Sequence, residues 1–256
     1  MKQKAPGKHS TRYGLARVLS KLGLCSRTQG AELVRAGRVR VNARIVRDPE
    51  SPTSLERDRI SIDDAPVVAQ ERIYIALNKP RGYVTTASDE RGRDTVYTLL
   101  QSGKGAPVDA RWLAPVGRLD KASEGLLLFT NDSIWAAALT DPAAHVDKTY
   151  HVQIDALADA ALLARLREGV IENGERLALK SVRELRRGEK NSWLEIVLDE
   201  GRNRQIRRVL AAFDVGVQRL VRVAIGALAL GGLAKGQWRS LSAAEVRSLA
   251  RPSETQ

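Results

Sequence analysis

The chain has 256 residues, 42 lysines and arginines against 30 acidic residues, and a net charge of +12. This length suits one large domain or a small domain followed by a medium one. No run of about 18 apolar residues occurs and the N-terminus lacks the apolar stretch of a signal peptide, which argues against a membrane or secreted protein. Cys25 is the only cysteine, so an internal disulfide is excluded and a reducing, cytoplasmic location is expected.

The positive charge is concentrated at the start of the chain. Residues 1–47 contain twelve lysines and arginines and one acid, Glu32, whereas the other 209 residues contain 30 basic and 29 acidic side chains. Such a block predicts a polyanion-binding module attached to a near-neutral domain. A merely solvated basic face is the alternative, and the elements predicted within this block favour nucleic acid.

Two short helices and a hairpin are predicted in this module. Apolar residues recur at helical spacing over 15–22, and Gly23 can end that helix. Ser26 with Gln29 three residues later forms a capping box for a second helix, which stops near Gly37.

Valine and isoleucine residues then flank the turn residue Asn42, as in a short hairpin, and Ile60 and Ile62 suggest one more strand. Seven basic residues fall on positions predicted to be exposed: Arg17, Lys21, Arg27, Arg35, Arg38, Arg40 and Arg44.

The segment LARVLSKLGLCSRTQGAELVRAGRVRVNARIV resembles an S4-type RNA-binding domain, in which two helices present basic side chains to structured RNA. The resemblance implies that Arg27 and Arg38 face RNA. An arginine fork can bind phosphate through two hydrogen bonds and stack on bases, although any single arginine here could be an ordinary surface charge. The predicted RNA-binding residues of this module are Arg17, Lys21, Arg27, Arg35, Arg38 and Arg40.

A segment rich in proline and charge, 48–70, follows the module. We therefore expect a basic tail over 1–12, an S4-like domain with its linker over 13–70, a catalytic domain over 71–250 and a tail over 251–256.

The larger domain alternates short strands and helices without regular βαβ spacing. This pattern predicts an α+β fold with a mixed, mainly antiparallel central sheet flanked by helices. Leu126–Thr130 is a continuous apolar run typical of a buried central strand, and Ser242 with Glu245 caps a last helix. The other predicted elements are strands over 73–77, 149–154, 193–198, 217–223 and 237–241, and a helix over 204–213.

The sequence lacks the motifs of several common kinds of enzyme chemistry. The three histidines and the cysteine have no metal-ligand spacing. No glycine-rich phosphate loop and no nucleophile elbow occur. If the chain is an enzyme, we expect a reaction that uses no metal and no cofactor.

The most informative stretch is APVGRLDKASEGLLLFTND, residues 114–132. It places Arg118 and Asp120 in a polar loop directly before a buried strand, and Gly117 and Gly125 let the backbone turn closely. An acid held there is partly desolvated and rigidly aimed, which suits a nucleophile. From the residues alone, a surface ion pair or a helix cap explains the two charges slightly better.

GRLD followed by S.GLLLFTND is similar to the signature of the RsuA-type pseudouridine synthases, which modify ribosomal RNA. LNKPRGYVTT at 77–86, KTYHV at 148–152 and LDEGRNRQIRRVL at 198–210 resemble three further motifs of that family, in the expected order. Ser123 stands where threonine is common and Ser133 where glycine is common, and neither departure touches the implied chemistry.

The resemblance implies a role for four residues. Asp120 would be the essential aspartate, and Tyr150 the tyrosine near the uracil ring. Arg207 would pair with Asp120 and keep it ionised, and Arg118 would help to hold the flipped-out nucleotide. Without the resemblance, Tyr150 is ordinarily a core aromatic and Arg207 a phosphate contact.

Six arginines and one acid lie between 202 and 222, and we assign Arg202, Arg204 and Arg208 to the RNA backbone. The expected function is isomerisation of a specific uridine in ribosomal RNA, with large-subunit RNA favoured by the segment NSWLEIVLDEGRNRQIRR. We expect a monomer that acts on ribosomal RNA or a ribosome-assembly intermediate and does not bind membranes. The alternatives are a catalytically silent ribosome-assembly factor and, more weakly, a DNA-binding regulator.

Overall fold

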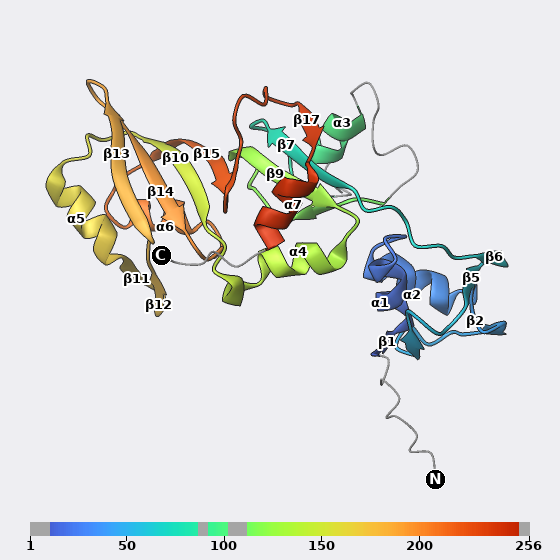
Figure 1. Cartoon of the computed structure of the whole chain (residues 1–256). Coiled ribbons are helices and arrows are strands. Elements are labelled where there is room, and N and C mark those ends of the chain that lie inside the picture. Colours follow the sequence, from blue (N-terminus) through green and yellow to red (C-terminus); the bar gives the residue numbers. More distant parts are fainter. Residues whose placement is uncertain (1–10, 87–91, 102–111, 251–256) are drawn as a thin grey trace, which may run out of the picture. The chain divides into compact units, whose positions relative to one another are not determined.

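The computed structural model describes residues 11–86, 92–101 and 112–250, which form two compact units (Figure 1). The first unit consists mainly of residues up to Ile73, and the second mainly of residues from Tyr74 onward. In the part of the chain that the structure describes, no helix is both long enough and apolar enough to cross a bilayer.

The first unit contains two helices and short paired strands. β2 lies between β3 and β5 in a four-stranded antiparallel sheet that β6 completes, and β1 pairs with β4. Its elements are β1 (Arg12–Gly14), α1 (Leu15–Lys21), α2 (Arg27–Arg35), β2 (Val39–Val41), β3 (Arg44–Ile45), β4 (Pro52–Ser54), β5 (Ile60–Ile62) and β6 (Ala65–Pro66).

Local signals set the ends of these elements. Gly23, just beyond α1, has φ +77°, a left-handed conformation that glycine adopts without strain. The predicted capping box at α2 is confirmed, since the Ser26 hydroxyl accepts from the Gln29 backbone N–H at 3.1 Å and the Gln29 side chain accepts from the Ser26 N–H at 3.0 Å. The predicted hairpin is also confirmed, with Asn42 and Ala43 at positive φ in its turn.

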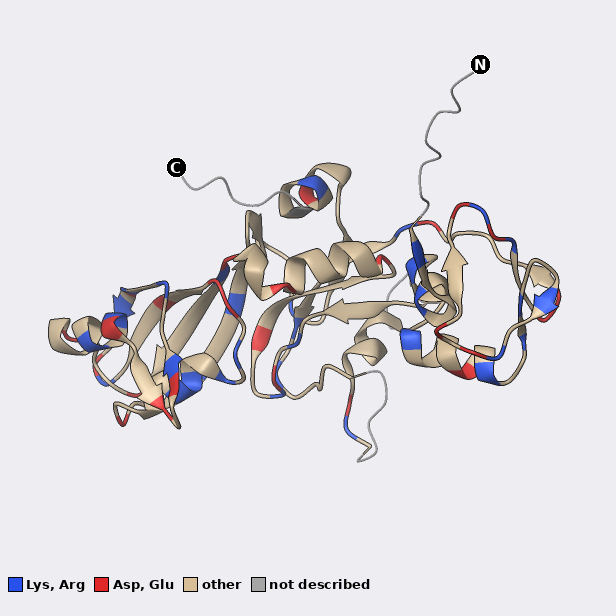
Figure 2. Cartoon of the chain, turned by 90° about the horizontal axis from the view of Figure 1, so that it is seen from below, with Lys and Arg blue, Asp and Glu red and all other residues tan. Residues whose placement is uncertain are grey.

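A small core fixes the two helices against the hairpin. Leu15, Val18, Leu19, Val34 and Val39 have no exposed surface. The basic residues of this unit, whose positions along the ribbon are blue in Figure 2, lie outside this core, and Arg17, Arg27 and Arg35 are exposed.

The second unit contains one large sheet and its flanking helices. Its elements are β7 (Tyr74–Lys79), α3 (Val96–Gln101), β8 (Ala114–Val116), β9 (Glu124–Thr130), α4 (Ser133–Thr140), a 3-10 turn (Pro142–Ala144), β10 (Lys148–Ile154), α5 (Ala160–Glu168), β11 (Val170–Glu172), β12 (Glu175–Leu177), β13 (Ser181–Arg187), β14 (Ser192–Leu198), α6 (Gln205–Ala211), β15 (Val217–Ile225), β16 (Leu228–Ala229), β17 (Trp238–Ser240) and α7 (Ala243–Ala250).

The strand order of the sheet is β13-β14-β10-β15-β9-β7-β17, with β16 on β15 and β8 on β9. β9 runs parallel to β15 and antiparallel to β7, and it is buried along its whole length. The predicted α+β fold with a mixed, mainly antiparallel sheet and a buried strand over 126–130 is therefore confirmed.

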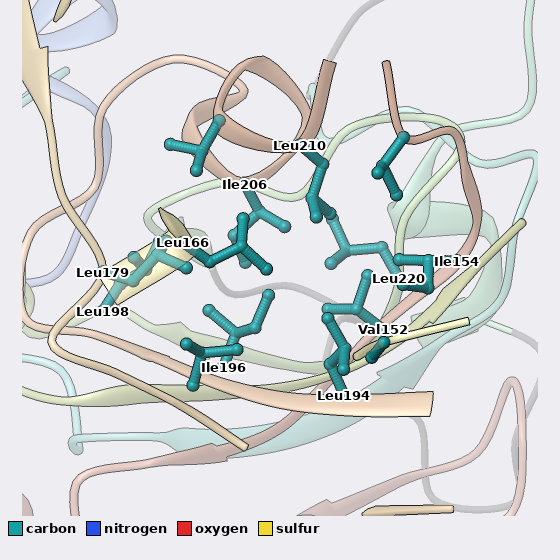
Figure 3. Close-up of a cluster of buried hydrophobic side chains, with 14 of the residues drawn as sticks. Val152, Ile154, Leu166, Leu179, Leu194, Ile196, Leu198, Ile206, Leu210 and Leu220 are labelled. Carbon is teal, nitrogen blue, oxygen red and sulfur yellow. The ribbon is translucent and has the colours of Figure 1, made fainter. Parts of the chain in front are cut away.

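Two apolar clusters hold the helices on this sheet. Around β10 and β14, Val152, Leu194 and Ile196 pack against Leu166 of α5 and Ile206 of α6, as Figure 3 shows. Around β9, Leu126 and Leu128 pack with Trp135 of α4. The loop between β8 and β9 and the start of α6 are thereby fixed to the sheet.

Candidate active site

Asp120 lies in the loop that joins β8 to β9, as the sequence predicts. The glycines on either side of it have positive φ, +72° at Gly117 and +102° at Gly125. A Cβ at position 125 would lie 2.2 Å from the backbone oxygen of Arg222 on β15. Only glycine permits this close approach of β9 to β15, and the approach fixes the end of the Asp120 loop.

A lysine that sequence reasoning missed holds the same loop. Lys79, the last residue of β7, has no exposed surface, and its Nζ donates to the backbone oxygens of Asp120 at 3.0 Å and Ser123 at 2.8 Å. Burial lowers its pKa to about 8, although the nearby Asp120 and Glu124 carboxylates oppose the shift. The sequence predicts a strand that ends at residue 77, but β7 continues through Lys79, whose side chain hydrogen-bonds to backbone oxygens of the Asp120 loop.

The carboxylate of Asp120 pairs with an arginine other than the predicted one. Arg204 Nη1 lies 3.5 Å from Asp120 Oδ2, and the Asp120 side chain is 38% exposed. Arg204 precedes α6 with φ +51°, a backbone conformation that is uncommon outside glycine.

The predicted ion pair between Arg207 and Asp120 is not formed among the described residues. Arg207 instead donates to the backbone oxygens of Ala122 and Val217, both at 3.4 Å. Burial lowers the pKa of Arg207, and the charge of Asp120 acts in the opposite direction. The guanidinium is therefore near Asp120, but backbone carbonyls hold its nitrogens, and its Nε is buried without a partner.

Tyr150 lies in the middle of β10, paired with Ile196 of β14 and Arg222 of β15. It is partly exposed, and it lines the same cavity as the Asp120 loop. This cavity of about 780 Å³ brings together all four residues to which the resemblance gave a role: Arg118, Asp120, Tyr150 and Arg207.

The cavity is strongly basic. Its wall includes eight lysines and arginines and two acids, Asp120 and Glu200. A concave surface with this charge balance favours an anionic ligand.

Two arginines that we assigned to the RNA backbone have partners within the protein. Arg202 pairs with Glu175 and Glu200, both at 2.8 Å. Arg208 pairs with Glu172 and, at 2.8 Å, with Glu175. The pairs with Glu172 and Glu175 join α6 and the loop before it to the β11–β12 hairpin, so an RNA phosphate would have to compete with carboxylates there.

The basic residues of the first unit differ in exposure and in whether they have a partner within the protein. Arg17, Arg27 and Arg35 are exposed, as is Arg44 in the hairpin. Arg38 pairs with Asp63 and Arg40 with Asp64. Lys21 and Arg17 lie over the ring of Tyr13, with Lys21 Nζ 4.3 Å from its centroid.

Comparison with known proteins gives two family matches. A model described as RNA pseudouridylate synthase matches residues 73–212, and the S4 domain model matches residues 14–56. Within residues 11–86, 92–101 and 112–250, no group of three or more histidine, cysteine and acidic side chains could hold a metal ion.

Curated relatives match along almost the whole chain. An uncharacterized RNA pseudouridine synthase of Aquifex aeolicus is 36% identical over 91% of this chain and 92% of the relative. Proteins named ribosomal large subunit pseudouridine synthase B are 33% identical in Bacillus subtilis and 36% identical in Escherichia coli K12. Both alignments cover 92% of this chain, with 94% of the Bacillus protein and 81% of the Escherichia protein.

A solved structure described as "Crystal structure of pseudouridylate synthase" is 30% identical, with a TM-score of 0.63. The alignment covers 94% of this chain and 100% of that one.

Proposed function

The chain belongs to the RNA pseudouridylate synthase family, and from that premise we propose that it converts one uridine of large-subunit ribosomal RNA to pseudouridine with Asp120 as the catalytic carboxylate. The names of the Bacillus and Escherichia relatives support the large-subunit substrate. One observation carries the assignment of the site: Arg118 with Asp120, Tyr150 and Arg207, which come from three separate segments of the chain, line one basic cavity.

The reaction breaks the N1–C1′ bond of the uridine, turns the uracil and joins C5 to C1′. Substrate and product are isomers, so atoms and electrons balance within the nucleotide. Cleavage either develops positive charge at the sugar or requires loss of its 2′ proton. The Asp120 carboxylate, partly exposed in the cavity wall, could act as nucleophile, electrostatic stabiliser or base in that step.

The arginines around Asp120 have distinct roles in this proposal. Arg207 is fixed by two backbone oxygens and supplies a rigid positive charge beside the carboxylate. Arg204 is half exposed and pairs loosely with Asp120, so it can exchange that partner for a phosphate of the incoming RNA. Arg118 lines the cavity on the Asp120 loop and would hold the extruded nucleotide.

Tyr150 offers a flat face for the detached uracil and a hydroxyl for the late proton transfer from C5. To reach it, the target base must leave its stack, which costs a few kcal/mol. Binding energy from the rest of the RNA must supply that cost, and the S4 domain provides further basic surface for it.

We also propose that residues 13–70 bind RNA and residues 71–250 perform the reaction, without a cofactor, as a monomer in the cytoplasm. A catalytically silent assembly factor would use the same basic surfaces. It would not need an acid in the wall of a cavity built for a polyanion, so Asp120 favours the enzyme.

Release of tritium from C5-labelled uridine in ribosomal RNA tests the proposal. The wild-type protein should release tritium from large-subunit RNA without an added cofactor. Asp120→Asn should bind the RNA with wild-type affinity and release none. Equal release by Asp120→Asn would overturn the catalytic assignment, and release from small-subunit RNA alone would overturn the substrate.

A further inference from the structure

The four strands at one end of the large sheet, β13, β14, β10 and β15, have two very different faces. Side chains alternate between the faces of a strand. Val152, Leu194, Ile196 and Leu220 point to one face, where α5 and α6 cover them (Figure 3). Lys148, Tyr150 and Arg222, which share that side by alternation, line the active-site cavity.

The neighbouring residues on these strands point the other way, and all of them are at least partly exposed. They are His151 and Gln153 of β10, Arg183 and Leu185 of β13, Trp193, Glu195 and Val197 of β14, and Arg219, Val221 and Val223 of β15. A hollow of about 400 Å³ lies on this face, lined by His151, Leu185, Arg186, Trp193, Val221 and Val223. None of these six residues lines the active-site cavity.

Trp193 lines the hollow, and two arginines of this open face lie over its ring. The guanidinium carbon of Arg186 lies 4.8 Å from the centroid of its ring, and that of Arg219 lies 5.5 Å from it. Arg219 is anchored at 3.2 Å to the buried carboxylate of Glu124. Arg186 is exposed and, among the described residues, forms no ion pair, so its guanidinium can leave the ring at little cost.

The charge of this face selects the kind of partner. Arg183 pairs with Glu195 and Arg219 with Glu124, whereas Arg186 has no ion pair among the described residues, so the face keeps a net positive charge. A second copy of the chain or another basic protein would place like charges together. A polyanion with flat apolar groups fits both the unpaired Arg186 and the partly exposed indole, and single-stranded RNA is such a ligand.

We propose that this face binds a single-stranded segment of the ribosomal RNA outside the target nucleotide. One unpaired base stacks on Trp193 above the apolar hollow, and Arg186 moves from the ring to the adjacent phosphate. The inference rests on the proposed function for the identity of the RNA. Binding is therefore measured with Asp120→Asn, so that its outcome does not depend on catalysis.

The test compares two arginines that both stack on an aromatic ring. Arg165 of α5 lies 4.4 Å from the ring centroid of Phe213 on the helical side and is exposed like Arg186. With a large-subunit RNA transcript and a short mixed-sequence single strand as probes, Arg186→Glu should weaken binding more than Arg165→Glu. The charge change is the same in both variants, so the difference reports the position.

Loss of one stacked base corresponds to roughly five- to 150-fold weaker binding, which is the effect expected for Trp193→Ala. Trp193→Phe keeps an aromatic face and should retain most of the affinity, which separates stacking from a folding defect. In single-turnover reactions with Asp120 intact, the control variant Arg165→Glu should react at the wild-type rate. Photochemical crosslinking should join RNA to the peptide that contains Trp193.

Wild-type affinity in both Arg186→Glu and Trp193→Ala would overturn the proposal, as would equal weakening in Arg165→Glu and Arg186→Glu. If Arg186→Glu keeps its RNA affinity but no longer binds ribosomal particles, the partner is a protein and the RNA proposal is wrong.

Discussion

The ammonium of Lys79 donates a hydrogen bond to the backbone carbonyl of Asp120 across 3.0 Å, from a side chain with no exposed surface. The same ammonium donates to Ser123 at 2.8 Å and Pro80 at 3.2 Å, so it joins the end of β7 to both halves of the Asp120 loop. A buried cation is costly unless its donors are satisfied. Here three backbone carbonyls accept from the ammonium, and these hydrogen bonds also fix the Asp120 loop.

Lys79→Met should change the pH dependence of stability. The pKa of Lys79 is about 8 in the folded protein because of burial, against 10.5 for an ordinary lysine. Between these values the unfolded chain holds a proton that the folded chain lacks, so the contribution of Lys79 to the free energy of unfolding rises with pH. Relative to that of Lys79→Met, the free energy of unfolding of the wild type should rise by up to about 3 kcal/mol between pH 8 and pH 10.5.

Urea unfolding of both proteins across that pH range measures the difference, in which groups that titrate alike in the two proteins cancel. If the difference in free energy of unfolding stays constant or falls as the pH rises, folding does not lower the pKa of Lys79.

Arg204→Ala and Arg207→Ala should have separable effects on catalysis. The exposed Arg204–Asp120 pair at 3.5 Å contributes little by itself, about 0–1 kcal/mol, so Arg204→Ala should mainly raise KM and reduce its salt dependence. Arg207 is partly buried and fixed beside Asp120, so Arg207→Ala should lower kcat by about 100-fold or more.

Kinetics of tritium release at several salt concentrations distinguish the two effects. Arg207→Lys is the matched control, because it keeps a charge but loses the fork that contacts two backbone oxygens. Equal losses of kcat in Arg204→Ala and Arg207→Ala would contradict this division of roles.

The elements that were predicted correctly carry their own local signals. The Ser26–Gln29 capping box, the Asn42 turn and the apolar run of β9 each require only neighbouring residues. α5 and the β11–β12 hairpin were missed although such signals exist. Asp159 caps α5, and Asn173 with Gly174 forms the left-handed turn that a tight hairpin needs.

The candidate site was predictable only in part. Asp120, Tyr150 and Arg207 came from motif resemblance, and the cavity brings them together. Lys79 sits in a segment whose composition indicates a turn, and its burial depends on acceptors about 40 residues away in the sequence. The pairing of Asp120 with Arg204 follows from a left-handed backbone conformation before α6, which no local pattern there indicates.

Removal of residues 1–65 should weaken RNA binding while the larger unit stays folded. The first unit has its own buried core and carries Arg17, Arg27 and Arg35 at its surface. For each phosphate that the truncated protein no longer binds, the slope of log affinity against log salt should fall by about 0.7–0.9. Salt titrations of RNA binding measure this, with circular dichroism of the truncated protein as the control for folding.

The double variant Arg27→Ala/Arg35→Ala tests the same surface in the full chain. It should lose more affinity than Arg38→Ala/Arg40→Ala, because Asp63 and Asp64 already neutralise the second pair. Unchanged affinity of the truncated protein at physiological salt would show that the first unit does not bind the RNA.

Gly125→Ala should disrupt the Asp120 loop and the sheet together. Its Cβ would lie 2.2 Å from the Arg222 oxygen and 2.8 Å from the Arg222 nitrogen, and φ at this position is +102°. Neither backbone can move freely, because β9 and β15 are central strands of the sheet. We therefore expect the free energy of unfolding to fall by at least about 3 kcal/mol, and tritium release to be lost. The control is Gly174→Ala, at φ +77° in the β11–β12 turn, where a Cβ meets nothing within 4 Å.

The Gly174→Ala variant carries only backbone strain, about 1–2 kcal/mol, and should keep its activity. Thermal unfolding and tritium release of the two variants side by side decide the matter, and equal destabilisation would show that the contact with Arg222 is not what requires glycine at position 125.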